Sequence, residues 1–140
     1  MIFVDTNVFM YAVGQFHPLQ QSAQDFFVEA NESGTPLCTS AEVLQELAHL
    51  YLPAGRLLVF DAAMMLIASA VVEVWPLEAA DVTLARQLHD RYPDLQSRDL
   101  CHLASCRRRG IRQIMTFDGA LAAVFGGASG ATQSDPTRAE

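Results

Sequence analysis

The chain opens with Ile2-Phe3-Val4-Asp5, three consecutive apolar residues followed by an acid. A continuous apolar run, unlike the alternation of a half-exposed strand, is typical of a strand buried on both faces of a parallel sheet. Similar short runs at 35–39, 71–75 and 113–116 predict three more strands. Because helical stretches separate the four runs, the sequence predicts an α/β fold whose parallel sheet is covered by helices on both sides.

The helices between these strands follow from apolar periodicity and from residues that cap or stop a helix. Ser40 and Ser97 are suitable N-caps, and Gly110 is a suitable terminator. We expect helices at residues 17–32, 41–52, 56–70, 79–91, 98–109 and 120–124.

The composition describes one folded, acidic domain. The 140 residues carry 16 acidic and 9 basic side chains, a net charge of −7 with neutral histidines. All nine basic residues are arginine, so mechanisms that need a lysine, such as Schiff bases and P-loop phosphate binding, are excluded. From Gly126 onward Gly, Ser, Thr, Asp and Pro dominate, so we expect a domain at 1–125 and a disordered tail at 126–140.

The cysteines and the apolar segments bear on the cellular compartment. Three cysteines without a CxxC pair fit a reducing environment better than a disulfide framework. No signal peptide is recognised before Asp5, and the longest apolar stretch, residues 62–72, is too short to span a bilayer. We therefore expect a soluble, cytoplasmic protein with no membrane partner.

Two acids lie at the carboxyl ends of predicted strands, where ligands bind to open parallel sheets. Asp5 directly follows the first strand, and Asp118 follows the last by two residues. Each also has a structural interpretation, since Asp5 could cap the next helix and Asp118, before Gly119, could form a turn.

Two predicted helices add further acids. On the helix at 41–52, Glu46 lies at the margin of the apolar stripe, whereas Glu42 falls on the opposite side and should sit nearer solvent. On the helix at 98–109, Asp99 heads the apolar face. Glu46 and Asp99 are therefore the better candidates for a buried site.

Carboxylates gathered without basic partners repel one another, and a divalent cation would relieve that repulsion. Oxygen ligands favour Mg²⁺ or Mn²⁺ over zinc. His102 stands beside Cys101 and Cys106, but this trio lacks the spacing of a zinc site. The sequence therefore predicts a Mg²⁺ (or Mn²⁺) site.

Four short motifs occur in a characteristic order across almost the whole folded part of the chain. They are Ile-Phe-Val-Asp5-Thr-Asn7, Thr39-Ser40 followed by Glu46, Arg98-Asp99-Leu-Cys-His-Leu-Ala, and Ile-Met-Thr116-Phe-Asp118. Together they resemble the PIN domains of VapC toxins, the ribonuclease half of bacterial toxin–antitoxin pairs. The resemblance implies a Rossmann-like, three-layer fold with four or five parallel strands. It also implies an acidic pocket that binds Mg²⁺ or Mn²⁺ and cleaves single-stranded or structured RNA.

The resemblance assigns roles by position. Asp5, Glu46, Asp99 and Asp118 match the family's four catalytic acids. Asp5 and Asp99 would bind the metal directly, Glu46 directly or through water, and Asp118 through water or at a second ion. The positions that match supporting polar residues of the pocket are Asn7 and Thr116.

RNA must approach this acidic chain, and six of its nine arginines lie between residues 91 and 112. Arg98 adjoins Asp99 and is the first candidate for a phosphate contact. The other expected RNA-binding residues are Arg107, Arg108 and Arg112. The alternative is a solvated helix end, where cations interact favourably with the helix dipole.

Two other functions stay open at this stage. One is a catalytically silent PIN-like module that binds RNA or protein. The other is a haloacid-dehalogenase-like phosphatase, which needs a second aspartate where this chain has Asn7, and normally a lysine. For a toxin, the expected partners are RNA and a small antitoxin, and the apolar segments 57–60 and 62–72 favour a homodimer.

Overall fold

A computed structural model of the protein describes residues 1–126. Its sheet has the order β3-β2-β1-β4, and every neighbouring pair is parallel. The strands are β1 (Ile2–Val4), β2 (Leu37–Ser40), β3 (Glu73–Trp75) and β4 (Gln113–Met115). The predicted α/β fold and its parallel sheet are confirmed. The tail expected at 126–140 lies, apart from its first residue, outside the described residues.

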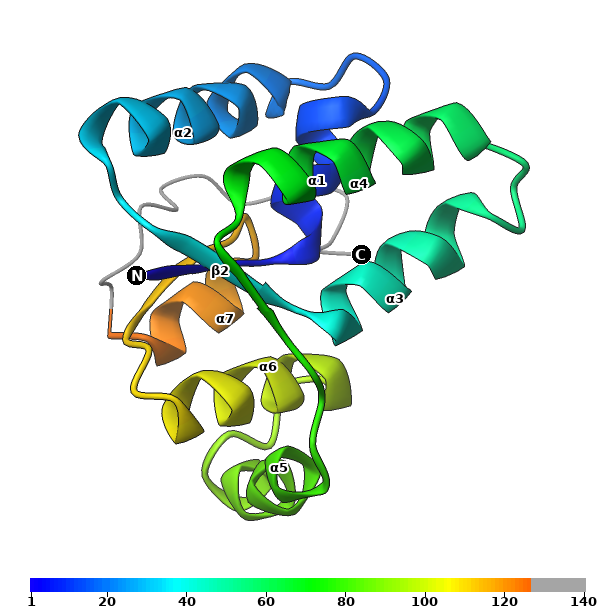
Figure 1. The fold of residues 1–140 in the computed structure, drawn as a ribbon. Coiled ribbons are helices and arrows are strands. Elements are labelled where there is room, and N and C mark those ends of the chain that lie inside the picture. Colours follow the sequence, from blue (N-terminus) through cyan, green and yellow to red (C-terminus); the bar gives the residue numbers. More distant parts are fainter. Residues whose placement is uncertain (127–140) are drawn as a thin grey trace.

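Helices cover both faces of this sheet. Within residues 1–126 they are α1 (Thr6–Val13), α2 (Gln20–Ser33), α3 (Ala41–Tyr51), α4 (Leu57–Ala70), α5 (Ala79–Arg91), α6 (Ser97–Arg108) and α7 (Gly119–Val124). Figure 1 shows α1, α2 and α4 on one side of the sheet and α5, α6 and α7 on the other, the predicted three-layer arrangement. None of these helices is long and apolar enough to cross a membrane.

The order of the strands determines where a ligand can bind. The connections from β1 to β2 and from β2 to β3 run over one face, and the chain then crosses the other face to reach β4 (Figure 1). The two crossover directions diverge between β1 and β4, which pair through Phe3–Ile114 and Val4–Met115. Such a switch point is the usual ligand site of an open parallel sheet. Asp5 and Thr116 directly follow the two strands there.

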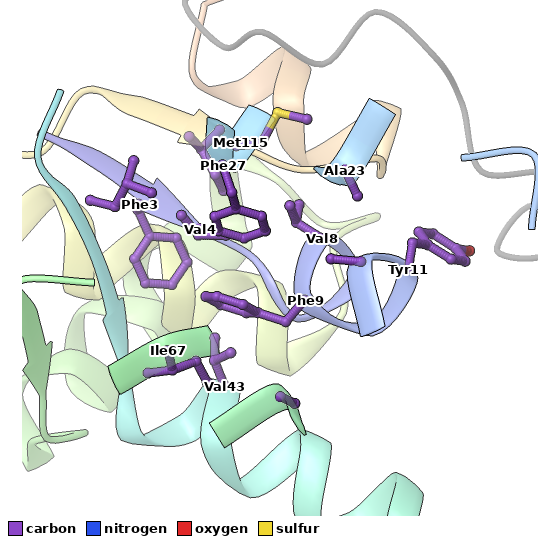
Figure 2. Packing of buried hydrophobic residues seen from close by; sticks show 14 of the residues in the cluster. Phe3, Val4, Val8, Phe9, Tyr11, Ala23, Phe27, Val43, Ile67 and Met115 are labelled. Atoms are coloured by element: carbon purple, nitrogen blue, oxygen red, sulfur yellow. The ribbon is translucent and has the colours of Figure 1, made fainter. Parts of the chain in front are cut away.

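Apolar packing holds the helices against β1. Phe3 and Val4 have no exposed surface, and Phe9 of α1 stacks on Phe27 of α2 with ring centroids 5.5 Å apart. Figure 2 shows these side chains together with Ile67 of α4 in one cluster. On the opposite face a smaller cluster packs α5 against α6 and contacts the end of α7. Both clusters hold the helices that carry the acids in fixed positions beside the sheet.

Helix α1 was not among the predicted helices, because the expected helix in this region begins only at residue 17. Six of its eight residues are buried, and residues 8–13 form one continuous apolar run that carries no charged residue to mark a polar face. The predicted cap at Ser40 is confirmed, since its Oγ accepts a hydrogen bond from the Val43 N–H at 3.4 Å. The predicted cap at Ser97 is wrong: Ser97 is the first helical residue and Gln96 occupies the cap position.

Candidate functional site

Asp5 is both a helix cap and a member of a buried cluster. Its Oδ1 accepts a hydrogen bond from the Thr6 N–H at 2.8 Å, and its Oδ2 accepts one from the Thr116 hydroxyl at 2.7 Å. The residue has no exposed surface. Because a buried carboxylate is stable only when hydrogen-bonded or paired, these donors also fix its orientation. The cap and the functional interpretation of Asp5 therefore apply together.

Thr116 and Asn7 connect α1 to the segment after β4. The Thr116 hydroxyl donates to Asp5 and accepts hydrogen bonds from Asn7 Nδ2 at 3.3 Å and from the Asp118 N–H at 3.0 Å. Asn7 Oδ1 in turn accepts from the Phe117 N–H at 3.2 Å. The two residues predicted to support the pocket thus lie between Asp5 and Asp118 and contact both chain segments.

His102 of α6 lies among three carboxylates. Its Nε2 is 3.0 Å from Glu46 Oε1 and 3.8 Å from Asp5 Oδ1, and its Nδ1 is 3.5 Å from Glu42 Oε2. The ring is 1% exposed and packs 5.4 Å from the ring of Phe3. The imidazole is therefore a central component of the site that the sequence patterns had treated as incidental.

The charges of this cluster are strongly coupled. Burial acts to lower the pKa of His102, but the hydrogen bond to Glu46 and the negative charges of Asp5, Glu46 and Glu42 outweigh it and raise the pKa to about 9. Burial acts to raise the pKa of Glu46, but hydrogen bonds from His102 and from the Thr6 hydroxyl, at 2.6 Å, hold it below its ordinary value. The chain thus supplies its own cation at neutral pH.

Glu42 does not lie near solvent, and the prediction that it should is wrong. The residue is 9% exposed, and burial raises its pKa against the opposing effect of His102. Within the described chain, Glu42 Oε2 and His102 Nδ1 are buried and lack a hydrogen-bond partner. A helical wheel cannot show this, because the polar face of α3 is covered by a side chain from α6, sixty residues further along.

The two remaining predicted acids, Asp99 and Asp118, are not among the three residues whose ligand atoms come together. Asp99, in the first turn of α6 and three residues before His102, is 4% exposed, as its place on the apolar face predicts. Asp118 is half-buried and caps α7, its Oδ1 accepting from the N–H groups of Ala120 and Leu121 at 3.0 and 3.3 Å. Its predicted turn role therefore coexists with its place beside Thr116.

The donor chemistry fits a divalent cation. Asp5, Glu46 and His102 each hold one potential ligand atom, and these three atoms lie within 4.8 Å of one another. The imidazole could take part only after losing its proton, so the two carboxylates are the ligands available while His102 is charged. Carboxylate oxygens suit Mg²⁺ and Mn²⁺, and an imidazole nitrogen suits the transition metals. The two buried atoms of the cluster without a hydrogen bond, Glu42 Oε2 and His102 Nδ1, face each other at 3.5 Å on the side of the ring away from Asp5 and Glu46.

Two of the predicted RNA-binding arginines, Arg98 and Arg108, lie near opposite ends of α6. Arg98 is exposed and close enough to Glu42 and Glu46 to lower the pKa of both carboxyls. Arg108 lies at the other end of α6, about 15 Å along the helix axis, and its Nη1 donates to Asp81 Oδ1 at 2.7 Å. This ion pair joins α5 to α6, so the structure gives Arg108 a structural partner.

Comparisons with known proteins agree with this geometry. Residues 2–125 match the family model described as PIN domain. Ribonuclease VapC23 of Mycobacterium tuberculosis is 54% identical over 125 residues, which cover 89% of this chain and 98% of that protein. The crystal structure of VapC20 from Mycobacterium tuberculosis, described as a sarcin–ricin loop cleaving toxin, has a TM-score of 0.71 at 23% identity and covers 89% of this chain and 95% of its own.

A toxin–antitoxin complex from Klebsiella pneumoniae shares the fold, with a TM-score of 0.63 at 16% identity, covering 88% of this chain and 91% of the other. The match of the family model over nearly all described residues agrees with the acids at the switch point between β1 and β4. The chain therefore belongs to the PIN-domain family, and within it to the VapC ribonucleases.

Proposed function

We propose that this protein is a Mg²⁺- or Mn²⁺-dependent endoribonuclease and the toxin of a toxin–antitoxin pair. The observation that carries the proposal is the buried cluster of Asp5, Glu46 and His102 at the sheet's switch point, beside Asp99. A cluster of this kind suits an ion that neutralises a phosphodiester. The ribonuclease name of VapC23 supports RNA as the substrate.

Each acid has a proposed role. Asp5 and Asp99 would hold the ion directly, Glu46 directly or through water, and Asp118 through water or at a second ion. A bound ion would neutralise charge on the phosphate and activate a water molecule. Neutral hydroxyl donors orient the first two carboxylates of the cluster, Thr116 on Asp5 and Thr6 on Glu46. Donors of this type fix the direction of ligand oxygens.

The cluster also explains how an acidic site persists before it meets a cation. His102 supplies the positive charge that three carboxylates require, and Phe3 shields one side of the ring. Arg98, exposed at the start of α6, is the proposed first contact for the RNA phosphate. Arg107 and Arg112 follow later in the chain and would contact more distant phosphates. Arg108, by contrast, is held by its hydrogen bond to Asp81.

The proposal includes two protein partners. The toxin–antitoxin complex of similar fold from Klebsiella pneumoniae supports a small antitoxin. A homodimer is supported by large apolar side chains exposed on α4, among them Leu58 at 85% and Met65 at 73%. Because the proposed substrate is cellular RNA, the proposal includes a cytoplasmic location.

The decisive experiment compares Asp5→Asn and Asp99→Asn with the wild type. Each variant keeps the side-chain shape and removes one negative charge, so we expect cleavage of a single-stranded RNA in Mn²⁺ to fall at least ~100-fold. Growth inhibition on expression should disappear. Asp61→Asn, an exposed position on α4, is the matched control and should cleave normally. Circular dichroism would show that all three variants fold.

Two outcomes would contradict the proposal. Wild-type rates in Asp5→Asn or Asp99→Asn would remove these acids from the site. A wild type that binds RNA but never cleaves it in Mn²⁺ would favour a silent binding module.

A further inference from the structure

A pocket of about 330 Å³ lies between α7 and the turn that joins α5 to α6. One wall consists of residues 91–95, and the other of Ala120, Ala123 and Val124. The first of these alanines donates its N–H to Asp118, and the turn ends four residues before Asp99. Each wall therefore belongs to a chain segment that also carries an acid of the proposed active site.

An arginine–tyrosine cluster of Arg91, Tyr92 and Arg107 extends from this pocket: Arg91 and Tyr92 line it, and Arg107 lines the neighbouring pocket and contacts Tyr92. The guanidinium carbons of Arg91 and Arg107 are 5.5 and 5.6 Å from the centre of the Tyr92 ring. Arg107 Nη2 also donates to the Tyr92 hydroxyl at 3.2 Å. Both exposed guanidiniums contact this ring, which restricts their rotamers and so reduces the conformational entropy lost when a ligand binds.

Three other arginines on or next to α5 and α6 form ion pairs with carboxylates. Arg86 binds Asp90 at 2.9 Å, and Arg108 and Arg109 bind Asp81 and Glu78 at 2.7 and 2.8 Å respectively. Between residues 1 and 126, Arg91 and Arg107 form no ion pair with a carboxylate. On a protein of charge −7, these two cations therefore have no carboxylate partner within the described chain and are available to an anion from outside it.

The remaining lining identifies the kind of anion. Pro93, Leu95 and Val124 offer apolar surface, and Asp94 offers a carboxylate that can accept hydrogen bonds. A nucleotide matches all three features, with a phosphate for the guanidiniums, an apolar base face, and base N–H donors for the carboxylate. An acidic peptide also supplies anions for the guanidiniums, but it lacks the planar base that would pack on the apolar wall and donate to Asp94.

We propose that this pocket binds a nucleotide of the RNA strand adjacent to the cleaved bond, with its phosphates on Arg91 and Arg107. The proposal rests on the ribonuclease activity proposed above. Helix α7 separates Asp118 from the far end of the pocket by about 9 Å, roughly three nucleotide steps of a stacked strand. The pocket therefore lies within reach of a strand whose phosphate occupies the acidic cluster.

The test measures RNA affinity without cleavage. A fluorescein-labelled single-stranded RNA of mixed sequence is titrated with protein in EDTA, and fluorescence anisotropy is followed at several salt concentrations. We expect Arg91→Gln and Arg107→Gln each to weaken binding about fivefold and to reduce the slope of log affinity against log salt by ~0.7. Arg86→Gln removes the same charge from α5, outside the pocket lining, and should behave as wild type.

The kinetic arm separates this proposal from the proposed activity. In Mn²⁺ the double variant Arg91→Gln/Arg107→Gln should raise KM about tenfold and leave kcat nearly unchanged, the signature of lost substrate binding. RNA affinity and salt slope equal to those of Arg86→Gln would overturn the pocket assignment even if cleavage is normal. Unchanged RNA binding with weakened antitoxin binding would assign the pocket to a protein, and would also overturn it. A wild type that shows the expected slopes but no cleavage would refute the activity and leave the pocket standing.

Discussion

The Nε2 atom of His102 lies 3.0 Å from Oε1 of Glu46, and this contact joins α6 to α3 across 56 residues of sequence. The same imidazole is 3.8 Å from Asp5 and 3.5 Å from Glu42. One buried cation therefore offsets three carboxylates. Because of this contact, both the stability of the fold and the metal affinity of the site should depend on His102.

Replacing His102 with Gln should destabilise the metal-free protein by about 3 kcal/mol, because three buried carboxylates would lose their cation. The measurement is urea unfolding in EDTA, with His49→Gln, an exposed position on α3, as the control. Mn²⁺ should then raise the melting temperature of His102→Gln more than that of the wild type, since the ion replaces the lost positive charge. Equal stability of the two histidine variants in EDTA would show that the imidazole is not the counter-ion.

Glu42 and Glu46, one turn apart on α3, provide a matched pair of substitutions. Glu46 has the shorter contact with His102 and lies within 4.8 Å of the other candidate ligand atoms, whereas Glu42 faces the opposite nitrogen of the ring. We expect Glu46→Gln to lower the Mn²⁺ affinity measured by titration calorimetry at least tenfold. Glu42→Gln should stay within about threefold of the wild type. The reverse order would assign the metal to Glu42.

The contrast between these two residues shows what the sequence could predict. The apolar strand runs, the existence of helices α2 to α7 and the burial of Asp99 depend on local patterns, and the structure agrees with them. The burial of Glu42 depends on His102 arriving from another helix, which no local pattern contains. A helical wheel assumes that a helix buries only its apolar face, whereas α3 is covered by other parts of the chain on two faces.

The missed helix and the arginines have related physical causes. Helix α1 is short and buried over six of its eight residues, and its continuous apolar run at 8–13 does not distinguish a helix from a strand. Arg107, Arg108 and Arg109 are indistinguishable in sequence, yet the first contacts Tyr92 and the other two bind Asp81. Which arginine stays accessible is decided by how α5 packs on α6. One signal was present for His102: a histidine on the same apolar face as Asp99, three residues away.

Thr116 should act on the metal site through Asp5. Its hydroxyl donates to Asp5 Oδ2 at 2.7 Å, and loss of that bond frees a carboxylate oxygen that would otherwise be oriented. Thr116→Val, which keeps the volume, should lower Mn²⁺ affinity about tenfold and cost about 1–2 kcal/mol of stability. Thr116→Ser keeps the hydroxyl and is the control. If Thr116→Val bound Mn²⁺ as tightly as Thr116→Ser, the hydroxyl would have no part in the site.

Asp81 should confer stability that disappears in acid. The residue has no exposed surface, and its carboxylate accepts hydrogen bonds from the Glu78 N–H at 2.8 Å and from Arg108 and Arg109. Burial acts to raise the pKa of Asp81, but these donors outweigh it and hold the pKa below 3.8. A lowered pKa stabilises the fold above the unfolded value and loses that effect as pH falls through the folded value.

Asp81→Asn should therefore be about 2 kcal/mol less stable than the wild type at pH 7, and the difference should shrink below about pH 4. Thermal unfolding followed by circular dichroism across this range provides the measurement. Asp90→Asn, which removes an exposed ion pair with Arg86, is the control and should have little effect at any pH. A difference between Asp81→Asn and the wild type that stays constant down to pH 3 would exclude the ionised carboxylate as its source.

Helix α4 should form the dimer interface, because its apolar residues divide between two faces. Ala63 and Ile67 are buried in the core, whereas Leu58 and Met65 are 85% and 73% exposed and lie seven residues apart on one side. Core packing accounts for the first pair and leaves the second in water, which soluble monomers rarely tolerate as a continuous patch. We expect a dimer in sedimentation velocity and at least a tenfold weaker association in Leu58→Glu. Val28→Glu, on α2 and 54% exposed, should associate as the wild type does. A monomeric wild type, or equal association of both variants, would show that the exposed face of α4 serves another partner, for which the antitoxin is the direct candidate.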